Sequence, residues 1–396
     1  MNRNYILFDD EKRVNLLPFT FTRPASEIRV GILTITEKWE KYLGQKPSFF
    51  TVDFLSGKYP ALKTNGEVCL VNGRITPNLD LLKAIQLLKQ EEAIVKEGTI
   101  IAAVLKGTPS KLPEPKNFSK VTEYSGTFFE VKNVWDIFRS NGDELLADFQ
   151  LITKGRKSQS ISSTNRIIHP ENIFVEEGAK VECAILNAEN GPIYIGADSE
   201  IMEGAIIRGP FAICEHSAVK MGAKVYGPTT VGPHSKIGGE VNNSVIFGYS
   251  NKAHDGFLGN SVIGEWCNIG ADSNNSNLKN NYAQVKLWNY SENHFAKTGL
   301  QFCGLFMGDH SKCGINTMFN TGTVVGVCAN IFGSGFPRNF IPSFSWGGAN
   351  GFMVHQVAKA IETAEIMMAR RSLNLTQTDR TILQHIFDIT ACYRNF

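Results

Sequence analysis

Aliphatic residues recur at every sixth position through the middle of the chain, from Val175 to Asn274. Glycine often follows the aliphatic residue directly, and a small residue often stands four positions after it. Each hexad of this kind supplies one short flat strand and one corner. Three hexads then make a triangular coil, and coils stack at the strand spacing of about 4.8 Å. The pattern therefore predicts a left-handed parallel β-helix.

The side chains predicted to fill this prism fall into two runs, and the phase slips by two residues within the first. The first run is Ile195, Ile201, Ile207, Ile213, Val219, Val225, Val231 and Ile237, and after the slip Val245, Phe257, Ile263 and Ile269. The second run is Met307, Cys313, Phe319, Val325 and Ile331. Because one coil cannot bury its own face, both ends of the stack need covers, which the chain before 175 and after 331 should supply.

The first 150 residues or so have a different pattern, in which short apolar runs alternate with helical periodicity. Strands are predicted at 4–10 (NYILFDD), 48–54 (SFFTVDF), 67–75 (EVCLVNGRI) and 99–106 (TIIAAVLK). A helix is predicted from 77 to about 93, with Thr76 as N-cap and Pro77 in its first position. Strands mixed with helices indicate a Rossmann-like α/β domain with a largely parallel sheet.

These patterns divide the chain into four parts. Residues 1–153 form the α/β domain, 154–166 a polar and basic linker, and 167–335 the β-helix. Residues 336–396 begin with a segment rich in glycine, proline and aromatic residues, and helices are predicted at 352–371 and 376–389.

Composition and charge narrow the range of partners. The 396 residues include 40 Lys and Arg against 38 Asp and Glu, a formal charge of +2, which favours neither a nucleic acid nor a membrane as partner. No apolar run approaches the roughly 20 residues that span a bilayer, and the start lacks the pattern of a signal peptide, so a cytoplasmic protein is expected. Eight scattered cysteines and eight histidines show no spacing typical of disulfides or zinc, and no metal centre is expected there. His216 and His234 lie eighteen residues apart and should stack on one outer face.

Residues 252–281 (KAHDGFLGNSVIGEWCNIGADSNNSNLKNN) carry a recognisable motif. This segment resembles the acetyltransferase half of the bacterial bifunctional N-acetylglucosamine-1-phosphate uridyltransferase/glucosamine-1-phosphate acetyltransferases and their archaeal relatives. The resemblance implies acetyl-CoA as donor, an amino-sugar 1-phosphate as acceptor, and a homotrimer with sites between subunits. It implies that His254 is the general base. Substrate or acetyl-CoA contacts are implied for Phe257, Asn268, Asn277, Lys279 and Lys286.

The chemistry of acyl transfer agrees with this assignment of His254. The reaction needs a neutral amine and removal of one proton, and imidazole, with a pKa near 6.5, suits that role. Carboxamides can hold the thioester oxygen as it becomes negative. The alternative is that His254 is a solvated corner residue and that Asn268, Asn277 and Lys279 serve only the turns. The sequence also departs from the motif, because Phe257 lacks a hydroxyl and Asn242 stands near the position of a phosphate-binding lysine.

The segment 13–31 (RVNLLPFTFTRPASEIRVG) resembles the opening motif of sugar-nucleotide pyrophosphorylases. The resemblance implies that Arg13 stands for the arginine of the phosphate loop, and Arg23 or Arg29 for a lysine of that motif. The loop itself is DDEKR, without the glycines that let a backbone approach phosphates closely. The strand ending in Asn72 and Gly73 resembles one that places a magnesium-binding aspartate, so nucleotide contacts and possible magnesium use are implied there. Arg74 stands where that aspartate would be.

Three functions remain open at this point. The first is an enzyme that N-acetylates glucosamine 1-phosphate and then transfers a nucleotidyl group from a nucleoside triphosphate, giving UDP-N-acetylglucosamine. The second keeps the acetyltransferase and makes the α/β domain a sugar-nucleotide-binding module. The third is a scaffold without catalysis. Arg74 and the missing glycines favour the second over the first, whereas His254 with its asparagines disfavours the third.

Overall fold

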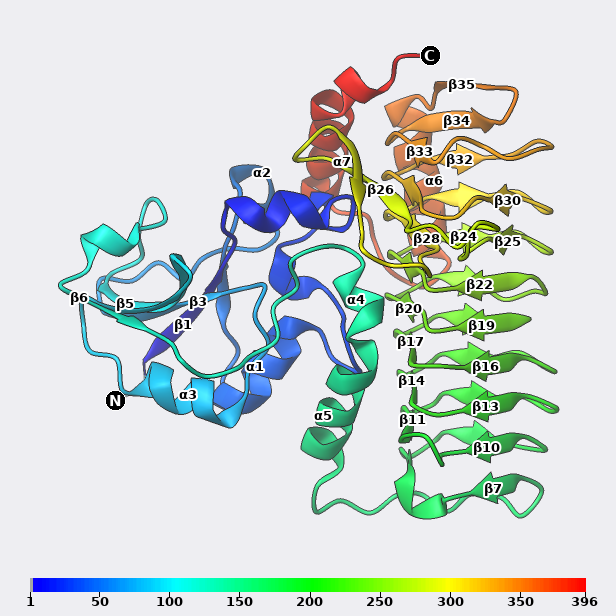
Figure 1. Ribbon diagram of the computed structural model, residues 1–396, viewed down its shortest axis with the longest axis horizontal. Coiled ribbons are helices and arrows are strands. Elements are labelled where there is room, and N and C mark those ends of the chain that lie inside the picture. Colours follow the sequence, from blue (N-terminus) through cyan, green and yellow to red (C-terminus); the bar gives the residue numbers. More distant parts are fainter. Residues whose placement is uncertain (1–2) are drawn as a thin grey trace. The chain divides into compact units, whose positions relative to one another are not determined.

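The computed structural model describes residues 3–396, which divide into two compact units (Figure 1). The first unit comprises Met1–Leu16, Thr22–Ile28 and Leu33–Lys132, and the second Leu17–Phe21, Arg29–Ile32 and Asn133–Phe396. The predicted fold class is confirmed: a nucleotidyltransferase-like α/β unit is followed by a left-handed parallel β-helix.

The first unit is built on a mixed sheet with the strand order β2-β1-β3-β5-β4-β6. Its parallel pairs are β1/β2, β1/β3 and β4/β6, whereas β5 runs antiparallel to β3 and β4. All four predicted strands are present, although the sheet is less parallel than expected. The strands are β1 (Asn4–Phe8), β2 (Ser48–Phe50), β3 (Glu67–Asn72), β4 (Glu92–Lys96), β5 (Thr99–Lys106) and β6 (Lys120–Glu123).

The predicted helix from 77 to 93 is too long. Helix α3 covers only Leu79–Gln86, its N-cap is Asn78 rather than Thr76, and the chain re-enters the sheet at β4. The Asn78 side chain accepts a hydrogen bond from the Leu81 amide at 2.8 Å, which satisfies one of the helix's free donors. The unit's other helical segments are η1 (Glu11–Leu16), η3 (Ala25–Glu27), α1 (Ile35–Leu43), α2 (Asp53–Ser56) and η4 (Pro115–Asn117).

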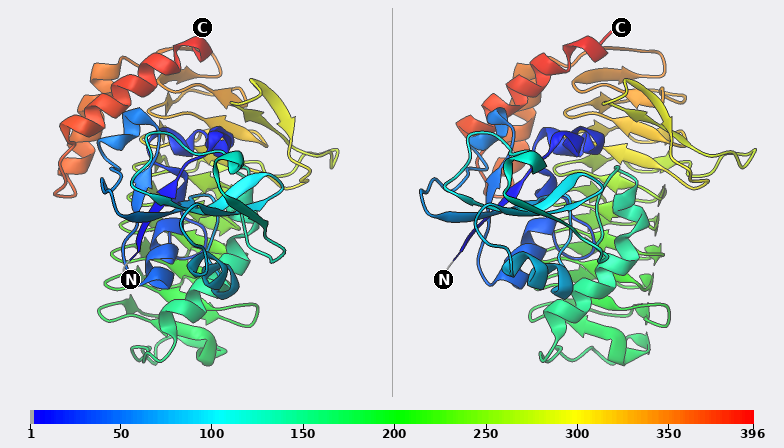
Figure 2. Two further views of the ribbon diagram at one scale, coloured as in Figure 1. Left: turned by 90° about the vertical axis from the view of Figure 1, so that its left-hand side faces the viewer. Right: turned by 60° about the vertical axis from the view of Figure 1, so that its left-hand side comes forward.

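Three parallel sheets form the walls of the prism in the second unit, and Figure 2 shows their stacked coils from two further sides. The six-stranded sheet contains β7 (Arg166–Ile168), β10 (Ile185–Asn187), β13 (Ile206–Arg208), β16 (Lys224–Tyr226), β19 (Glu240–Asn242) and β22 (Phe257–Gly259). The nine-stranded sheet contains β8 (Ile173–Val175), β11 (Ile193–Ile195), β14 (Phe211–Ile213), β17 (Thr229–Val231), β20 (Val245–Ile246), β23 (Val262–Ile263), β28 (Leu305–Met307), β31 (Thr323–Val325) and β33 (Phe340–Ile341).

The ten-stranded sheet forms the third wall, and its last pair, β34/β35, is antiparallel. Its strands are β9 (Lys180–Val181), β12 (Glu200–Ile201), β15 (Ala218–Val219), β18 (Lys236–Ile237), β21 (Asn251–Lys252), β24 (Asn268–Ile269), β29 (Lys312–Cys313), β32 (Asn330–Ile331), β34 (Ser345–Gly348) and β35 (Gly351–Val354).

The core of the prism confirms most of the predicted interior positions. All eight residues from Ile195 to Ile237 belong to one buried apolar cluster, as do the five from Met307 to Ile331. Two predictions are wrong, because the register places Ile246 and Leu258 inside instead of Val245 and Phe257. The turn after β18 is shortened, so that Val241 follows Ile237 as the next interior residue after four positions instead of six. The predicted slip after Ile237 is therefore present, but it is spread over several short steps, so Val245 and Phe257 were wrong whereas Ile263 and Ile269 lie inside as predicted.

The chain leaves the prism once before its last coils and again after them. Residues 276–304 leave the coils, and within them β26 (Lys286–Asn289) and β27 (His294–Lys297) form an antiparallel hairpin. The predicted helix at 352–371 begins later, because 351–354 form strand β35 and helix α6 covers Val357–Ala369. Helix α7 (Gln377–Ile389) matches its prediction, with Thr376 in a capping box with Asp379.

Two short N-terminal segments cluster with the second unit, together with α4 (Asp136–Arg139) and α5 (Asn141–Thr153). The Gly31 amide donates to the Asn141 carboxamide oxygen at 2.8 Å, and the Asn141 amide donates to the Thr230 hydroxyl at 3.0 Å. Asp148 accepts from the Ile32 amide at 2.8 Å. These buried bonds attach 133–153 to the coils, whereas the predicted first domain extended to 153.

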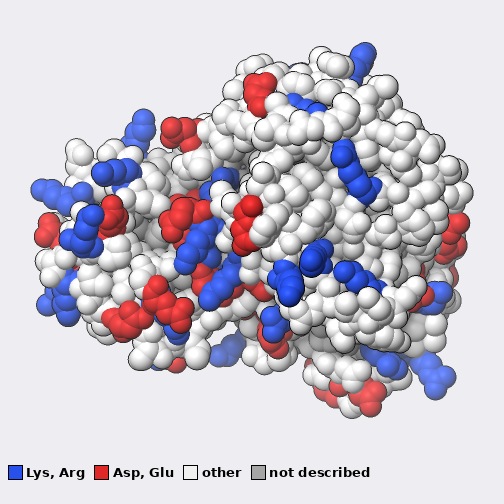
Figure 3. Space-filling view, turned by 45° about the horizontal axis from the view of Figure 1, so that its top comes forward, with Lys and Arg blue, Asp and Glu red and all other residues white. Residues whose placement is uncertain are grey.

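Surface charge is mixed on the face drawn in Figure 3, where basic and acidic side chains stand next to one another. Among residues 3–396, no helix combines the length and apolar character needed to cross a bilayer.

A matched pair of substitutions in β13 tests the prism core. Ile207 is fully buried, whereas its neighbour Ile206 is 48% exposed. Ile207→Ala should lower the free energy of unfolding by about 2 to 5 kcal/mol because it leaves a cavity, while Ile206→Ala should change it by less than about 1 kcal/mol. Urea titrations followed by circular dichroism measure both, and equal losses would contradict the assigned register.

Candidate functional sites

The turn after β21 holds the predicted base, His254, by means of a buried lysine. Lys252 pairs with Ile237 in the register of the ten-stranded sheet, and is therefore in an interior column, with 3% exposure. Its ammonium donates a hydrogen bond to the carbonyl oxygen of His254. Burial lowers the pKa of Lys252 to about 8, against the opposing charges of Asp255, Cys313 and Asp272. The His254 side chain is exposed at the corner between the ten-stranded and six-stranded sheets.

Phe257 and Asn277 lie together on the six-stranded face that follows this turn. The Phe257 amide donates to the Asn274 side chain at 2.7 Å, and Asn277 donates to the Asn260 side chain at 2.7 Å. A Cβ on Gly259 would come within 2.4 Å of the Phe257 ring and 2.8 Å of the Asn277 amide nitrogen. Only glycine leaves both side chains in place here, so the strand is built to carry them side by side.

The two predicted lysines beyond Asn277 lie on the excursion from the coils. The ammonium of Lys279 is 3.4 Å from the carbonyl oxygen of Gln284, and Lys286 is exposed at the start of the hairpin, opposite Lys297. Gln284 and Asn260 both line an open cavity of about 590 Å³ that also includes Arg139. Asn277 and Lys279 are not in the lining themselves, but each is hydrogen-bonded to a residue that lines this cavity, Asn277 to Asn260 and Lys279 to Gln284.

The six-stranded face also explains a departure from the acetyltransferase motif. In the register, Glu240 lies directly opposite Phe257, and it accepts a hydrogen bond from the Tyr226 hydroxyl at 2.5 Å. This bond, with burial and the Glu240 charge, raises the pKa of Tyr226 to about 12. Lys224 is 3.9 Å from the same carboxylate. Where the motif has a phosphate-binding lysine, the face beside Phe257 therefore carries Asn242 and the Glu240 carboxylate, which is paired with Tyr226 and Lys224.

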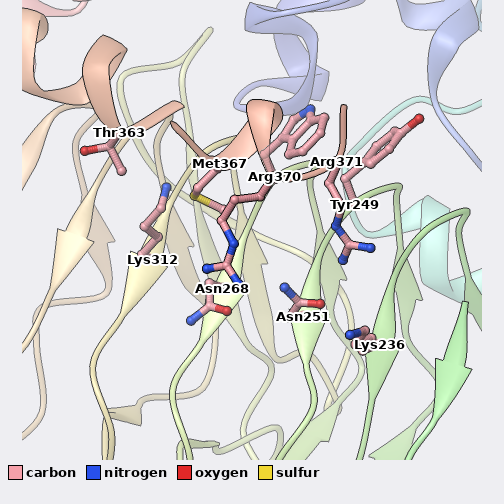
Figure 4. A pocket seen from close by; sticks show the side chains of 10 residues that line it. Lys236, Tyr249, Asn251, Asn268, Lys312, Thr363, Met367, Arg370 and Arg371 are labelled. Atoms are coloured by element: carbon pink, nitrogen blue, oxygen red, sulfur yellow. The ribbon is translucent and has the colours of Figure 1, made fainter. Parts of the chain in front are cut away.

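Asn268, the remaining predicted residue, lies on a different wall of the prism. It is the first residue of β24 and pairs with Asn251 in β21 and Lys312 in β29. It lines a groove of about 690 Å³ with residues that follow or belong to α6 (Figure 4). Within a single chain, the structure brings Phe257 and Asn277 together, leaves His254 at the corner between two walls, and separates Asn268 from them.

In the first unit, Arg74 is the centre of a buried ion-pair network. It is fully buried, and its guanidinium binds Asp10 through two hydrogen bonds of 2.9 and 2.6 Å and Glu130 through one of 2.5 Å. Burial alone would raise the pKa of Asp10, but the Arg74 bonds and charge outweigh it and hold that pKa below its usual range. Asn72 is also committed to this network, because its amide donates to Asp10 at 2.9 Å and its oxygen accepts from the Arg74 amide at 3.0 Å.

The other predicted nucleotide contacts are mostly internal. Arg13 is buried, with its guanidinium 3.2 Å from Asp9, and Arg23 is 5% exposed. A Cβ on Gly73 would lie 3.1 Å from the Phe8 carbonyl oxygen, so this glycine serves the packing of the strand ends. Arg29 belongs to the second unit, where its guanidinium donates to the Ile32 carbonyl and lies 3.8 Å from the Cys214 sulfur. These five residues are thus not gathered at one open site.

A cavity of about 300 Å³ in the first unit is lined instead by residues that the sequence did not single out. Lys12, Lys96 and Lys132 supply positive charge, and Phe128 and Phe129 supply aromatic surface. The lining also includes Glu97 and Glu130, and Glu130 lies 3.7 Å from the Lys132 ammonium. The Lys12 ammonium donates to the Thr99 hydroxyl at 2.9 Å, and Lys96 lies 5.1 Å from the centre of the Phe128 ring. Lys12 directly precedes Arg13 in the loop after β1, so its position in the sequence could have marked it as a candidate nucleotide contact. The other two lysines needed the sheet to bring them together.

Comparisons with known proteins match the N-terminal part of the chain, including α4 and α5, to one family. Residues 5–157 match the sugar nucleotidyl transferase family model. A curated relative, the bifunctional sugar-1-phosphate nucleotidylyltransferase/acetyltransferase of Sulfurisphaera tokodaii, is 31% identical over 216 residues, or 54% of this chain and 47% of the relative. The chain thus spans about half the length of that relative. The two findings confirm the resemblance to the bifunctional sugar-1-phosphate enzymes.

Solved structures of similar architecture have low overall similarity. The polySia-specific acetyltransferase NeuO is 13% identical, covering 52% of this chain and 98% of its own, with a TM-score of 0.28. UDP-N-acetylglucosamine acyltransferases from Arabidopsis and Campylobacter jejuni are 13% and 14% identical, covering 54% and 58% of this chain and 80% and 91% of theirs, with TM-scores of 0.26 and 0.24. With scores this low, the architecture rests on the strand pairings of the chain itself.

The pKa of Lys252 gives a pH-dependent test of the turn at His254. Because the folded pKa of about 8 lies below the usual 10.5, the unfolded chain binds more protons at Lys252 between these values, and the contribution of Lys252 to the free energy of unfolding should rise with pH there. Buried thiols such as Cys267, whose pKa burial raises, contribute a fall over the same range, so the rise is measured as the difference between wild type and Lys252→Met. Below pH 8 the folded protein bears the full cost of the buried charge. Lys252→Met should remove the rise, whereas Lys180→Met, at an exposed position, should keep it. Urea titrations between pH 7 and 10.5 measure the difference, and parallel curves for wild type and Lys252→Met would contradict the assignment.

Proposed function

We propose that the β-helical unit transfers the acetyl group of acetyl-CoA to the amine of an amino-sugar 1-phosphate, glucosamine 1-phosphate, with His254 as general base. The observation that carries this proposal is the turn at 252–256. A buried lysine fixes the His254 backbone, and the imidazole stands exposed at the edge of the face that bears Phe257 and Asn277. The match to a bifunctional nucleotidylyltransferase/acetyltransferase supports the reaction class.

The chemistry needs only groups that this surface offers. The sugar amine attacks the thioester carbonyl and forms the C–N bond, while the imidazole of His254 takes the proton that the nitrogen must lose. Collapse of the tetrahedral intermediate breaks the C–S bond, and the imidazolium returns its proton to the departing CoA thiolate. Carboxamide N–H groups, of which Asn277 and Asn268 are the candidates, would stabilise the oxyanion.

The same geometry motivates a homotrimer. Asn268 and Asn277 lie on different walls of one prism, and His254 is exposed at the corner between these walls. We propose that neighbouring copies pack their prisms side by side, so that the asparagine of one copy completes the site of the next. A closed threefold assembly would cover each exposed His254.

Replacing the proposed base should remove most of the acetyl transfer. We expect His254→Ala to lower kcat for CoA release from acetyl-CoA and glucosamine 1-phosphate by about 10² to 10⁴-fold, the usual contribution of a general base. A thiol reagent reports the released CoA. His216→Ala, an exposed histidine on another corner, is the control and should keep wild-type turnover. Unchanged turnover in His254→Ala would show that the base lies elsewhere.

Two functions are proposed for the first unit. The first is nucleotidyl transfer from UTP to N-acetylglucosamine 1-phosphate, giving UDP-N-acetylglucosamine, and the family match at 5–157 supports it. The second is sugar-nucleotide binding without transfer, and Arg74 favours it. Asp10 and Glu130, the carboxylates beside the end of β3, are both bound to the Arg74 guanidinium. These two carboxylates do not fit a magnesium ion, because the Arg74 guanidinium already neutralises their charge and is bound by the oxygens that would coordinate the metal.

An assay with UTP, magnesium and N-acetylglucosamine 1-phosphate separates the two functions. Under the binding function we expect no pyrophosphate above background, but measurable affinity for UDP-N-acetylglucosamine by calorimetry. Lys96→Met should weaken that binding about tenfold or more, because it removes a cation from the 300 Å³ cavity. Lys63→Met, at an exposed position outside that cavity, should bind like wild type. Steady pyrophosphate release by wild-type protein would instead establish transfer.

A further inference from the structure

One outward column of the ten-stranded sheet is unusually polar and basic. Lys236, Asn251, Asn268 and Lys312 are the first residues of β18, β21, β24 and β29, and the register pairs each with the next. At the strand spacing of about 4.8 Å, the column extends over about 14 Å. It thus presents two ammonium groups separated by two carboxamides along a single straight line.

Helix α6 and the residues after it close this column into a groove of about 690 Å³. Figure 4 shows Arg370 and Arg371 pointing toward Asn268 and Asn251, while Lys312 points toward Thr363. Two arginines and two lysines therefore converge on one space from opposite sides. The groove belongs entirely to the second unit.

Negative charge is missing from the groove. Its ten lining residues include four cations and no carboxylate, and none of the four forms an ion pair with a carboxylate among residues 3–396. Glu265 and Glu215 act on the neighbouring Tyr249, whose pKa is raised mainly by burial, but neither lines the groove. Burial lowers the pKa of Lys312, whose ammonium donates to the His310 carbonyl oxygen at 2.8 Å. The basic groups of the groove have no carboxylate partner in the described part of the chain and repel one another, and a bound polyanion would relieve that repulsion.

The rest of the lining limits the kind of anion. The stacked rings of Tyr249 and Trp266, whose centres are 4.3 Å apart, line the groove, and Met367 adds apolar surface. The side-chain oxygen of Asn251 is buried and accepts no hydrogen bond from the described chain, so it can accept one from a ligand hydroxyl or N–H. A volume of this size fits a nucleotide and exceeds what a single phosphate ion would fill.

We propose that this groove binds the diphosphate of a nucleotide, with the four cations on the phosphates and the Asn251 carboxamide on a hydroxyl or amine of the nucleoside. Two sources share that chemistry: the adenosine diphosphate end of CoA, and a free nucleoside diphosphate or its sugar ester. The groove shares Asn268 with the proposed acyl-transfer site but not the turn that carries His254, and binding to the groove can be measured without acyl transfer.

Calorimetry on the full chain tests the proposal in the Lys96→Met background, which weakens binding in the cavity of the first unit. The probes are CoA, UDP and pyrophosphate, with uridine as the uncharged control. We expect CoA or UDP to bind with an affinity that falls as salt is raised, pyrophosphate to compete, and uridine not to bind. Arg370→Gln/Arg371→Gln should weaken binding at least tenfold, whereas Lys180→Met/Lys224→Met, which also removes two charges, should not.

The outcome also identifies the source. If Arg370→Gln/Arg371→Gln loses only CoA binding, the groove binds the acetyl donor. If it loses only UDP binding, the groove binds a free nucleotide. If the arginine variant does not fold, Asn251→Asp puts a negative charge in the groove and should weaken the same ligand. The proposal is overturned if no probe binds at millimolar concentration, or if the variants bind as tightly as the background. Calorimetry measures binding rather than turnover. Absence of binding in the groove would therefore not contradict the proposed acetyltransferase activity, and unchanged turnover in His254→Ala would not contradict binding in the groove.

Discussion

The stacking of one inward side chain per strand is the constraint on which the second unit depends. Each interior residue packs against its equivalents in the coils above and below, so the strands must stay in parallel register through the whole stack. The same register aligns the outward residues into columns. Outward side chains from distant parts of the sequence, such as Lys236 and Lys312, therefore come to lie in one line without any contact that is local in sequence.

The candidate chemistry lies where this regular pattern is interrupted. The interior spacing shortens after Ile237, and the second interior position after Val241 is then taken by Lys252 rather than an aliphatic residue. A buried ammonium is costly, and its bond to the His254 carbonyl offsets part of that cost while it orders the turn. The stack thus gives up some core stability at the point where an exposed imidazole is presented.

The first unit also has a buried charge at the end of a strand, Arg74 after β3. Asp10 and Glu130 lie at the end of the sheet where a nucleotidyl transferase would use acidic groups, but Arg74 binds both. Removing one member of such a buried network leaves uncompensated charge, so the three residues depend on one another. The cavity beside this network is lined by Lys12, Lys96 and Lys132.

The sequence alone determined the architecture, because a six-residue period can be satisfied only by coils of one geometry, and the motif at 252–281 pointed to His254 within it. It showed that the phase slips after Ile237, but it could not place the slip, since a hexad count does not show how the missing residues are divided among neighbouring turns. The sequence also assigned residues to one site because they are close together along the chain. Only the tertiary structure put Asn268 on one wall and Asn277 on another, and buried Arg13 and Asn72 among acidic partners. Whether two side chains share a site depends on sheet register and packing across the chain, and these long-range contacts have no local signature in the sequence.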